Sequence, residues 1–411
     1  MPLSLRWVGE SDLDLVNATR VGCYAPAVKD MEKFRDALQQ EPRSKPGDYL
    51  IAEEGGEAVG TSTSLSLTTW VRGSPLPCQG VAWVGTIRTH RRGGEGTAPG
   101  IGSRLMHETL RMGRDRGEVI STLMPFRASF YERFGYGLVE RRCDWTIPLA
   151  ILPCGTTDGI RFSRPADRQA IADCHQRAVE RGQCDMQRSA TRWEHIVNHT
   201  LGDGFEVVDR PAANGPVRGQ MFYSQFSKDG KDILRVHSRF ADDLAAFQRQ
   251  LHFLASLKDQ YHAVTLTLPA DVPLNWLLEE RQIPHRLVNH PTAEMRPFTR
   301  MQARVLDHKK LLEAMHLPPE FRGEAVIAVH ETEGHTSKFR VNLSEGRASA
   351  APTDAAADVE CRDTVWASIA LGDLPARQAA SLELLAVHQP KAIALLEALA
   401  AGPVPFCEEY F

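Results

Sequence analysis

The sequence predicts an α+β fold in which helices cover mixed β-sheets, arranged as three successive domains. The chain has 411 residues, which is more than one ordinary hydrophobic core accommodates. Strand-like and helix-like apolar patterns alternate along it. A helix flanked by strands occurs in the first 150 residues and again after a turn-rich segment at residues 151–160.

Composition and charge narrow the class of protein. Hydrophobic residues make up 42% of the chain and charged residues 24%, which is typical of a soluble globular protein. The net charge of −4 gives no reason to expect a nucleic-acid partner. No stretch is long and apolar enough to span a membrane, and the first residues do not form a signal peptide. Eight scattered cysteines without a CxxC pair indicate a reducing environment, so we expect a cytoplasmic protein.

Residues 1–150 form the first predicted domain. Ser11 is a candidate helix N-cap ahead of Leu13 and Val16. A second helix is expected at residues 31–40, and a third at residues 101–116, where Ile101, Leu105 and Met112 share one face. The expected strands cover residues 49–52, 58–70, 81–88 and 119–124.

Residues 151–295 form the second predicted domain, and its beginning resembles that of the first. Residues 161–167 lead into an apolar helix as residues 5–12 do. A strand, a helix and a strand follow at residues 233–237, 244–257 and 263–268. The parallel order suggests a divergent internal duplication, with chance similarity of two α/β segments as the alternative.

Residues 296–411 form the third predicted domain. A helix is expected at residues 301–315, followed by strands, an alanine-rich turn region near residues 347–357 and helices that end at Leu399. The expected strands cover residues 325–330, 338–343 and 358–362.

A strand that leads into a glycine-rich basic turn and then a helix suggests phosphate binding. Residues 83–94 carry Arg91 and Arg92 ahead of glycines, and residues 100–106 begin the helix. Glycines let the backbone approach an anion, and helix-terminal N–H groups donate to it. Taken alone, the same pattern also fits a solvated glycine–arginine loop.

The surrounding residues resemble the GNAT acetyltransferase superfamily and its R-x-x-G-x-G/A motif. Residues 89–92 together with residues 129–137 resemble the enhanced intracellular survival (Eis) family within it. The resemblance implies tandem GNAT-like domains, the second degenerate, and acetyl-CoA as the acetyl donor. It implies that the donor contacts Val84, Gly85, Thr86, Arg91, Arg92, Gly93, Gly94, Gly100, Ile101, Gly102, Ser103, Phe126 and Arg127.

The phosphate loop departs from the family pattern. Residues 93–99 look like an insertion, and Glu95 adds a negative charge beside the expected phosphates. Either the insertion bulges outward and residues 100–102 supply the amides, or the pocket is weakened. We favour the bulge, because Pro99 is a normal helix entry.

Two groups are predicted to carry the chemistry. Tyr131 occupies the position of the family's general acid, and a phenol can protonate a departing thiolate. A buried core aromatic is the alternative, and Tyr136 is interpreted as structural. The resemblance implies that the terminal carboxylate of Phe411 enters the active site as general base, and it would place Glu408 and Glu409 where they attract polyamines.

The resemblance implies an N-acetyltransferase for primary amines of aminoglycoside-like, polyamine or lysine substrates, assembled as a homo-hexamer. It also implies a sterol-carrier-like last domain. No metal is expected, since His195 and His199 lack a third ligand. The second copy is expected not to bind CoA, because Asp242 and Asp243 stand at its helix entry. The alternative function is an inactive acyltransferase scaffold that binds a lipid or a protein partner.

Overall fold

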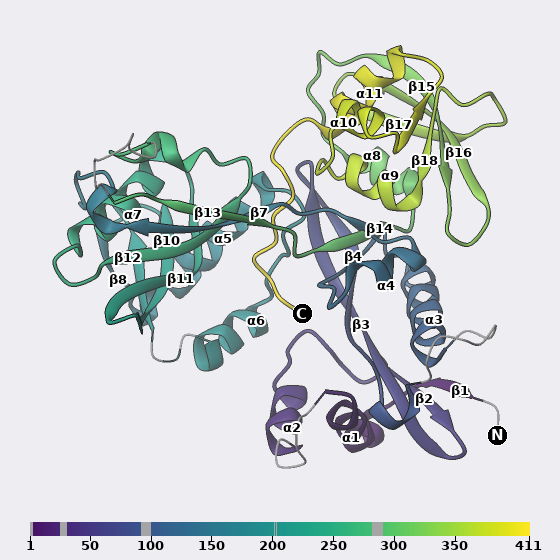
Figure 1. Ribbon diagram of the computed structural model, residues 1–411, viewed down its shortest axis with the longest axis horizontal. Helices are drawn as coiled ribbons and strands as arrows, with labels where there is room; N and C mark the ends of the chain where they lie inside the picture. The colour runs from purple at the N-terminus through teal and green to yellow at the C-terminus, as the bar shows by residue number, and fades with distance from the viewer. Residues whose placement is uncertain (1–2, 25–30, 92–99, 201, 203, 282–290) are drawn as a thin grey trace. The chain divides into compact units, whose positions relative to one another are not determined.

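The structure is a computed structural model that describes residues 3–24, 31–91, 100–200, 202, 204–281 and 291–411. The chain divides into two compact units (Figure 1). The first unit comprises residues 1–139, 301–402 and 409–411, and the second comprises residues 140–300 and 403–408.

A seven-stranded sheet of order β1-β2-β3-β4-β5-β14-β6 organises the N-terminal part of the first unit. Only β4 and β5 run parallel. The strands are β1 (Ser4–Trp7), β2 (Tyr49–Glu54), β3 (Glu57–Val71), β4 (Ser74–Thr86), β5 (Ile120–Leu123), β6 (Gly137–Leu138) and β14 (Gln302–Val305). The predicted strands are confirmed, although β4 begins seven residues before the expected start at residue 81.

Helices cover both faces of this sheet. They are α1 (Leu13–Tyr24), α2 (Met31–Gln39), α3 (Ile101–Asp115) and the short α4 (Ala128–Tyr131). Gly60 in β3 lies against Ile101 of α3, whereas Gly85 in β4 lies against Cys23 of α1. A Cβ at either glycine would approach these helices to within 3.0 Å, so the missing side chains allow close packing.

The second unit contains a sheet of the same size, with the order β13-β7-β12-β11-β10-β9-β8. Its strands are β7 (Arg142–Pro148), β8 (Ile160–Phe162), β9 (Phe205–Asp209), β10 (Gly219–Lys228), β11 (Lys231–Ala241), β12 (Ala263–Pro269) and β13 (Glu294–Phe298). Its α-helices are α5 (Arg168–Arg181), α6 (Ala190–His195) and α7 (Leu244–Ser256). Phe247, Leu251 and Leu254 of α7 pack into the core of this sheet.

The two sheets have matching strand orders, and each takes its sixth strand from an unexpected part of the chain. β14 follows the second unit in sequence but lies between β5 and β6 of the first sheet. β7 directly follows the first unit but lies between β12 and β13 of the second sheet. The predicted domain borders at residues 150 and 295 stay a prediction. The structure adds that β7, which precedes residue 150, belongs to the second sheet, and that β14, which follows residue 295, belongs to the first.

The predicted helix at residues 301–315 is wrong in its first half. Residues 302–305 form β14, and a shorter helix, α8 (His308–Ala314), follows. All four residues of β14 are buried, because both neighbours and both faces of the sheet cover them. The four residues of β14 alternate polar and apolar, but such a short run does not distinguish a strand from the start of the helix that follows.

One ion pair recurs in both units and supports the internal duplication. In the first unit, Arg6 binds Asp12 with N–O distances of 3.0 and 3.2 Å, and the Gly9 N–H donates to the same carboxylate. In the second unit, Arg161 binds Asp167 with two distances of 2.7 Å, and the Arg164 N–H donates to it at 2.8 Å.

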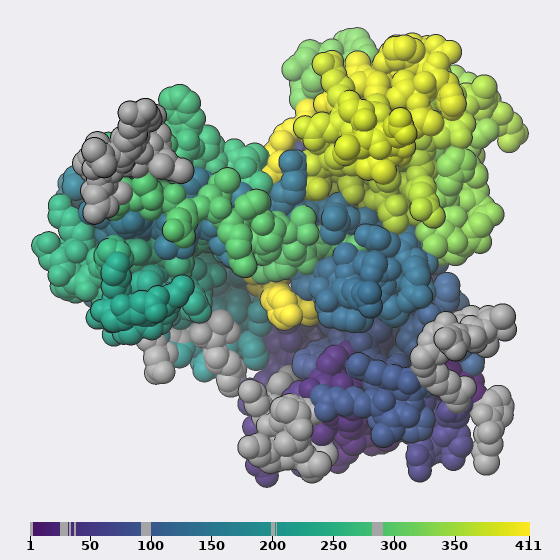
Figure 2. Space-filling model, viewed as in Figure 1, coloured from purple at the N-terminus to yellow at the C-terminus, as the bar shows by residue number. Residues whose placement is uncertain are grey.

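Residues after β14 form a compact body within the first unit, yellow-green in Figure 2. Its sheet has the order β17-β16-β15-β18-β19. The strands are β15 (Gly323–His330), β16 (Thr336–Ser344), β17 (Arg347–Pro352), β18 (Val359–Arg362) and β19 (Leu385–Val387), and the helices are α8, α9 (Asp363–Ala370), α10 (Ala376–Ser381) and α11 (Lys391–Ala400). The expected alanine-rich turn is wrong for residues 347–352, which form β17 with small alternating side chains facing the core.

The structure also bears on membrane-spanning segments and on the cysteines. Within the described ranges, no helix has the length and apolar character needed to cross a membrane. No disulfide joins any of the eight cysteines, all of which lie in the described ranges.

Candidate active site

The candidate site begins where β4 and β5 diverge. Their parallel ladder contains three residue pairs and ends at Gly80 and Thr122. β4 continues to Thr86, whereas β5 ends at Leu123. Beyond Gly80, the β4 edge that faced β5 therefore has no strand partner among the described residues. Alternate backbone groups of residues 84–86 face this open edge, where they can bind an extended ligand as another strand would.

A bulge marks this part of β4. Trp83 has a φ of +54°, a left-handed conformation that is uncommon outside glycine, and the register with β3 shifts beside it. The indole ring contacts Tyr24 and Phe34 edge-on and lies 4.6 Å from the guanidinium carbon of Arg20. Burial lowers the pKa of Arg20 to about 10. No local sequence pattern predicts this cluster, because its members come from α1, α2 and β4, which are separate in the sequence.

The N-terminus of α3 faces the same region and suits an anion. Gly100 is the N-cap, no side chain caps the helix, and its first turn contains no acidic residue. The Ser103 N–H donates to the Gly100 carbonyl at 3.0 Å. The preceding amides, at Ile101 and Gly102, thus remain for a phosphate, which the helix dipole also favours.

The predicted phosphate loop is described only at its edges. Arg91 is exposed, and its Nε donates to the Thr86 carbonyl at 3.3 Å. Arg92, Gly93 and Gly94 lie outside the described residues, as does the rest of the insertion through Pro99. The predicted helix start at Ile101 is confirmed.

Three elements converge beside Tyr131. A Cβ on Gly102 would lie 3.5 Å from the Phe130 ring and 3.9 Å from the Thr86 hydroxyl oxygen. The ring centroid of Phe130 is 5.0 Å from that of Tyr131. The structure therefore brings together the end of β4, the start of α3 and the short helix α4.

Phe126 and Arg127 lie at the rim of this region. The Phe126 side chain is 73% exposed, and its ring is 5.8 Å from that of Tyr131. Arg127 is exposed and is the N-cap residue of α4. Both side chains are accessible to a ligand, and their contact with the acetyl donor stays a prediction.

Tyr131 and Tyr136 differ in how their hydroxyl groups are used. Tyr136 is fully buried, and its hydroxyl lies 2.6 Å from the Ser121 hydroxyl, which also bonds Gln79. Tyr131 is 5% exposed, and no hydrogen bond holds its hydroxyl to any described residue. Burial raises the pKa of Tyr131 to about 12, so the phenol stays protonated at neutral pH. Its hydroxyl is thus available to a ligand, whereas that of Tyr136 is structural.

The chain terminus packs on the same strand. A Cβ added to Gly80 would lie 3.2 Å from the Phe411 ring and 2.6 Å from Leu67, so glycine leaves the room that the ring occupies. The next residue, Val81, belongs to the buried cluster that contains Tyr131. The Phe411 ring and the buried cluster that contains Tyr131 therefore both pack on β4, on consecutive residues close to the point where β4 and β5 diverge.

The preceding tail residues are held in the second unit. The Cys407 N–H donates to Glu140 at 2.8 Å, and Arg142 and Arg300 donate to the Cys407 carbonyl. Glu409 belongs to the first unit, where it is 3% exposed and paired with Arg43. The expectation that Glu409 attracts polyamines is therefore wrong, because its charge is buried and already neutralised.

One acidic cluster lies outside this site. Glu331, Glu333 and Asp363 bring their oxygens close enough together to hold a cation. Arg304 contacts all three carboxylates. Its guanidinium supplies the positive charge that this cluster needs.

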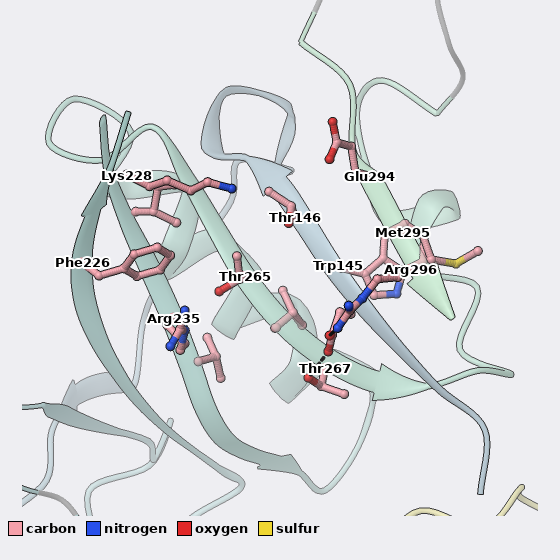
Figure 3. A pocket seen from close by; sticks show the side chains of 14 residues that line it. Trp145, Thr146, Phe226, Lys228, Arg235, Thr265, Thr267, Glu294, Met295 and Arg296 are labelled. Atoms are coloured by element: carbon pink, nitrogen blue, oxygen red, sulfur yellow. Dashed lines mark hydrogen bonds and ion pairs between the residues drawn. The ribbon is translucent and has the colours of Figure 1, made fainter. Parts of the chain in front are cut away.

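The second sheet diverges at the matching position but carries different side chains. Its parallel ladder also ends after three pairs, at Arg235 and Thr265, so Arg235 stands where the first sheet has Gly80. Asp243 caps α7 by accepting the Ala246 N–H at 2.8 Å. A hollow of about 600 Å³ opens over these strands (Figure 3), with Lys228, Arg235 and Arg296 among its lining residues.

Comparisons with known proteins agree with this architecture. Residues 4–139 and residues 184–305 each match a family described as acetyltransferase (GNAT) domain. An uncharacterized N-acetyltransferase of Streptomyces avermitilis is 24% identical over all of this chain and 99% of its own length. N-acetyltransferase Eis of Mycobacterium tuberculosis is 25% identical over 86% of each chain.

Solved structures show the same fold over the full chain. Eis1 from Mycobacterium abscessus superposes with a TM-score of 0.79 at 20% identity and full coverage of both chains. A GCN5-related N-acetyltransferase from Anabaena variabilis superposes with a TM-score of 0.82 at 18% identity, again over both full chains. With its two GNAT domains and its full-length relatives, the chain belongs to the Eis-like N-acetyltransferases of the GNAT family.

Proposed function

We propose that this N-acetyltransferase transfers acetyl from acetyl-CoA to primary amines of aminoglycoside-like, polyamine or lysine substrates, with Tyr131 as general acid and the Phe411 carboxylate as general base. The observation that carries the proposal is that the Phe411 ring packs on Gly80 and that Tyr131 belongs to the buried cluster of the next residue, Val81, where β4 leaves β5.

The described residues fit acetyl-CoA, which supplies the acetyl group as a thioester. The open edge of β4 at Val84, Gly85 and Thr86 suits an extended amide-bearing arm. The uncapped start of α3 at residues 100–103 suits phosphate. Arg91 and Arg127 are exposed near these elements, and Arg92, Gly93 and Gly94 complete the proposed set.

Tyr131 holds a proton on its phenol oxygen throughout the neutral range and can donate it to the leaving sulfur. Burial raises the pKa of thiols as it does that of phenols, so the departing thiolate is a stronger base in this site than it is in water. The Phe411 carboxylate accepts the proton of the attacking amine, directly or through a water molecule. A carboxylate is a weak base in water, so exclusion of water by the Phe411 ring is part of its role.

We propose that the last domain is sterol-carrier-like and that its role is to bring the C-terminus to the active site. The resemblance rests on residues 368–373, at and just after the end of α9, and on residues 392–400 of α11, and most residues of both segments are buried. The family resemblance also supports a homo-hexamer, which a mass measurement by light scattering tests.

The test of the function follows thiol release from acetyl-CoA with a panel of aminoglycosides, polyamines and lysine peptides. Tyr131→Phe should lower kcat by about 100-fold, the usual contribution of a general acid. Tyr136→Phe is the matched control, and it should retain kcat while lowering thermal stability.

A chain with two extra C-terminal residues should also lose about 100-fold in kcat, because its carboxylate is displaced. The same two residues added at the N-terminus serve as control. Binding of CoA by calorimetry without turnover of any amine would favour the inactive scaffold instead. Failure to bind CoA would overturn the whole proposal.

A further inference from the structure

One arginine holds two of the last three residues. Arg43 lies between α2 and β2, and its side chain is 11% exposed. Its Nη1 donates to the Glu409 carboxylate at 3.1 Å and to the Tyr410 carbonyl at 2.9 Å. A single guanidinium nitrogen therefore holds both a side chain and the backbone of the tail.

A second contact fixes the arginine itself. Its Nε and Nη2 donate to the two oxygens of Glu41, each at 2.7 Å. This fork geometry is bidentate, and it fixes the plane of the guanidinium. The remaining nitrogen thus points in a defined direction toward the tail.

Side chains of the tail alone do not explain why the terminus is ordered. The Tyr410 ring is 67% exposed and contributes little burial. Glu409 is buried but charged, so it requires a partner, and Arg43 provides one. Phe411 is the remaining anchor, with its ring on Gly80.

Chain ends fray unless they are held, whereas a catalytic group must stay within about 0.5 Å of its working position. We propose that Arg43, oriented by Glu41, is a positioning residue that sets the location of the Phe411 carboxylate. This inference rests on the proposed function, in which that carboxylate is the general base.

Arg43→Ala tests the inference, and it should lower kcat by about 10-fold while the KM for acetyl-CoA stays within twofold. Arg43→Lys should recover only part of kcat, because an ammonium cannot bind Glu41 bidentately and the tail at once. Added guanidinium ion should restore part of the kcat of Arg43→Ala. The matched control is Arg35→Ala, which removes an exposed arginine paired with Asp14.

A double-mutant cycle separates positioning from a general loss of structure. In the chain extended by two C-terminal residues, Arg43→Ala should change kcat by less than twofold, because the carboxylate is already displaced. Equal losses in both backgrounds would overturn the inference, as would an Arg43→Ala enzyme with the kcat of the wild type. Full activity of the extended chain itself would overturn the role of Phe411, an outcome distinct from any result at Arg43.

Discussion

The two GNAT sheets share a strand order and a diverging pair of parallel strands, yet only the first has the features of an acetyl-transfer site. In the first sheet the ladder ends at a glycine that leaves room for the Phe411 ring. In the second it ends at Arg235, whose guanidinium lies 4.5 Å from the Phe226 ring. At the point of divergence, the same backbone therefore leaves room for the terminal ring in the first sheet and carries an arginine in the second.

The helix that follows the divergence differs in the same way. α3 begins without a cap or an acid, so its amides are available to phosphate. α7 begins with Asp243, which takes up an amide and puts negative charge at the helix start. The carboxylate pKa of Asp243 is lowered by the Ala246 N–H and by Arg218, so it stays ionised. The two sheets thus share a strand order but differ at the positions where we propose that acetyl-CoA and the terminus bind.

The largest effect is expected when Gly80 of the first sheet is replaced by arginine, the residue at the matching position of the second sheet. Gly80→Arg forces a side chain into space held by Leu67 and Phe411, and it should lower kcat by at least about 100-fold by displacing the terminus. Steady-state kinetics with calorimetry of CoA binding would show this, since binding depends on residues further along β4 and on α3.

Gly9→Arg is the control for that variant, because no atom lies within 4 Å of a Cβ at Gly9. Arg235→Gly makes the reverse change and should leave kcat unaltered. If Gly80→Arg retained wild-type kcat, the comparison between the sheets would lose its main support.

The second prediction adds an acid to the start of α3. Ser103→Asp should weaken CoA binding by about 10-fold, because a carboxylate repels phosphate where helix amides attract it. The helix itself should gain stability, since an acid in the first turn suits the dipole. Isothermal titration measures the affinity, and Ser103→Asn, of similar size and no charge, should bind within about twofold of the wild type.

The third prediction removes the cap of α7. Asp243→Ala should destabilise that helix by about 1 kcal/mol, the usual value for losing an N-cap. Hydrogen exchange should show faster exchange at the α7 amides, while kcat stays unchanged. A fall in kcat without a change in α7 protection would show that the second sheet takes part in catalysis.

The smallest expected effect concerns the repeated ion pair. Hydrogen bonds from Arg161 lower the pKa of Asp167 to about 2, from an ordinary value of 3.8. Because the folded-state pKa is the lower one, Asp167 stabilises the fold above pH 4, and this contribution is lost as the pH falls toward 2. Asp167→Asn should lower stability at pH 7 by about 1 kcal/mol, because Asp167 is buried but its partner Arg161 is 30% exposed, so solvent screens the pair in part.

Denaturant unfolding at pH 7, 4 and 3 would test that expectation, with the difference between Asp167→Asn and wild type shrinking as the pH falls. Asp12→Asn should show the same trend with a smaller amplitude, because Asp12 is more exposed than Asp167. A difference that grew at low pH would contradict the assignment.

Structural features that depend only on neighbouring residues could be predicted from the sequence. The 3.6-residue periodicity from Ile101 predicted α3 and its start, as the structure confirms. The similarity between residues 5–12 and 161–167 predicted the duplication, which the two GNAT matches and the repeated ion pair support. Local patterns suffice in these cases because the interactions themselves are local.

Only the tertiary structure decided the features that depend on distant partners. Residues 302–305 are a strand because β5 and β6 surround them, and periodicity alone favoured a helix there. The contrast between Gly80 and Arg235 emerges only once the two ladders are aligned pair by pair. The hydrogen bond from Arg43 to Glu409 joins residues 366 positions apart in the chain. Such pairings are set by packing and charge across the whole chain, which no local window of sequence contains.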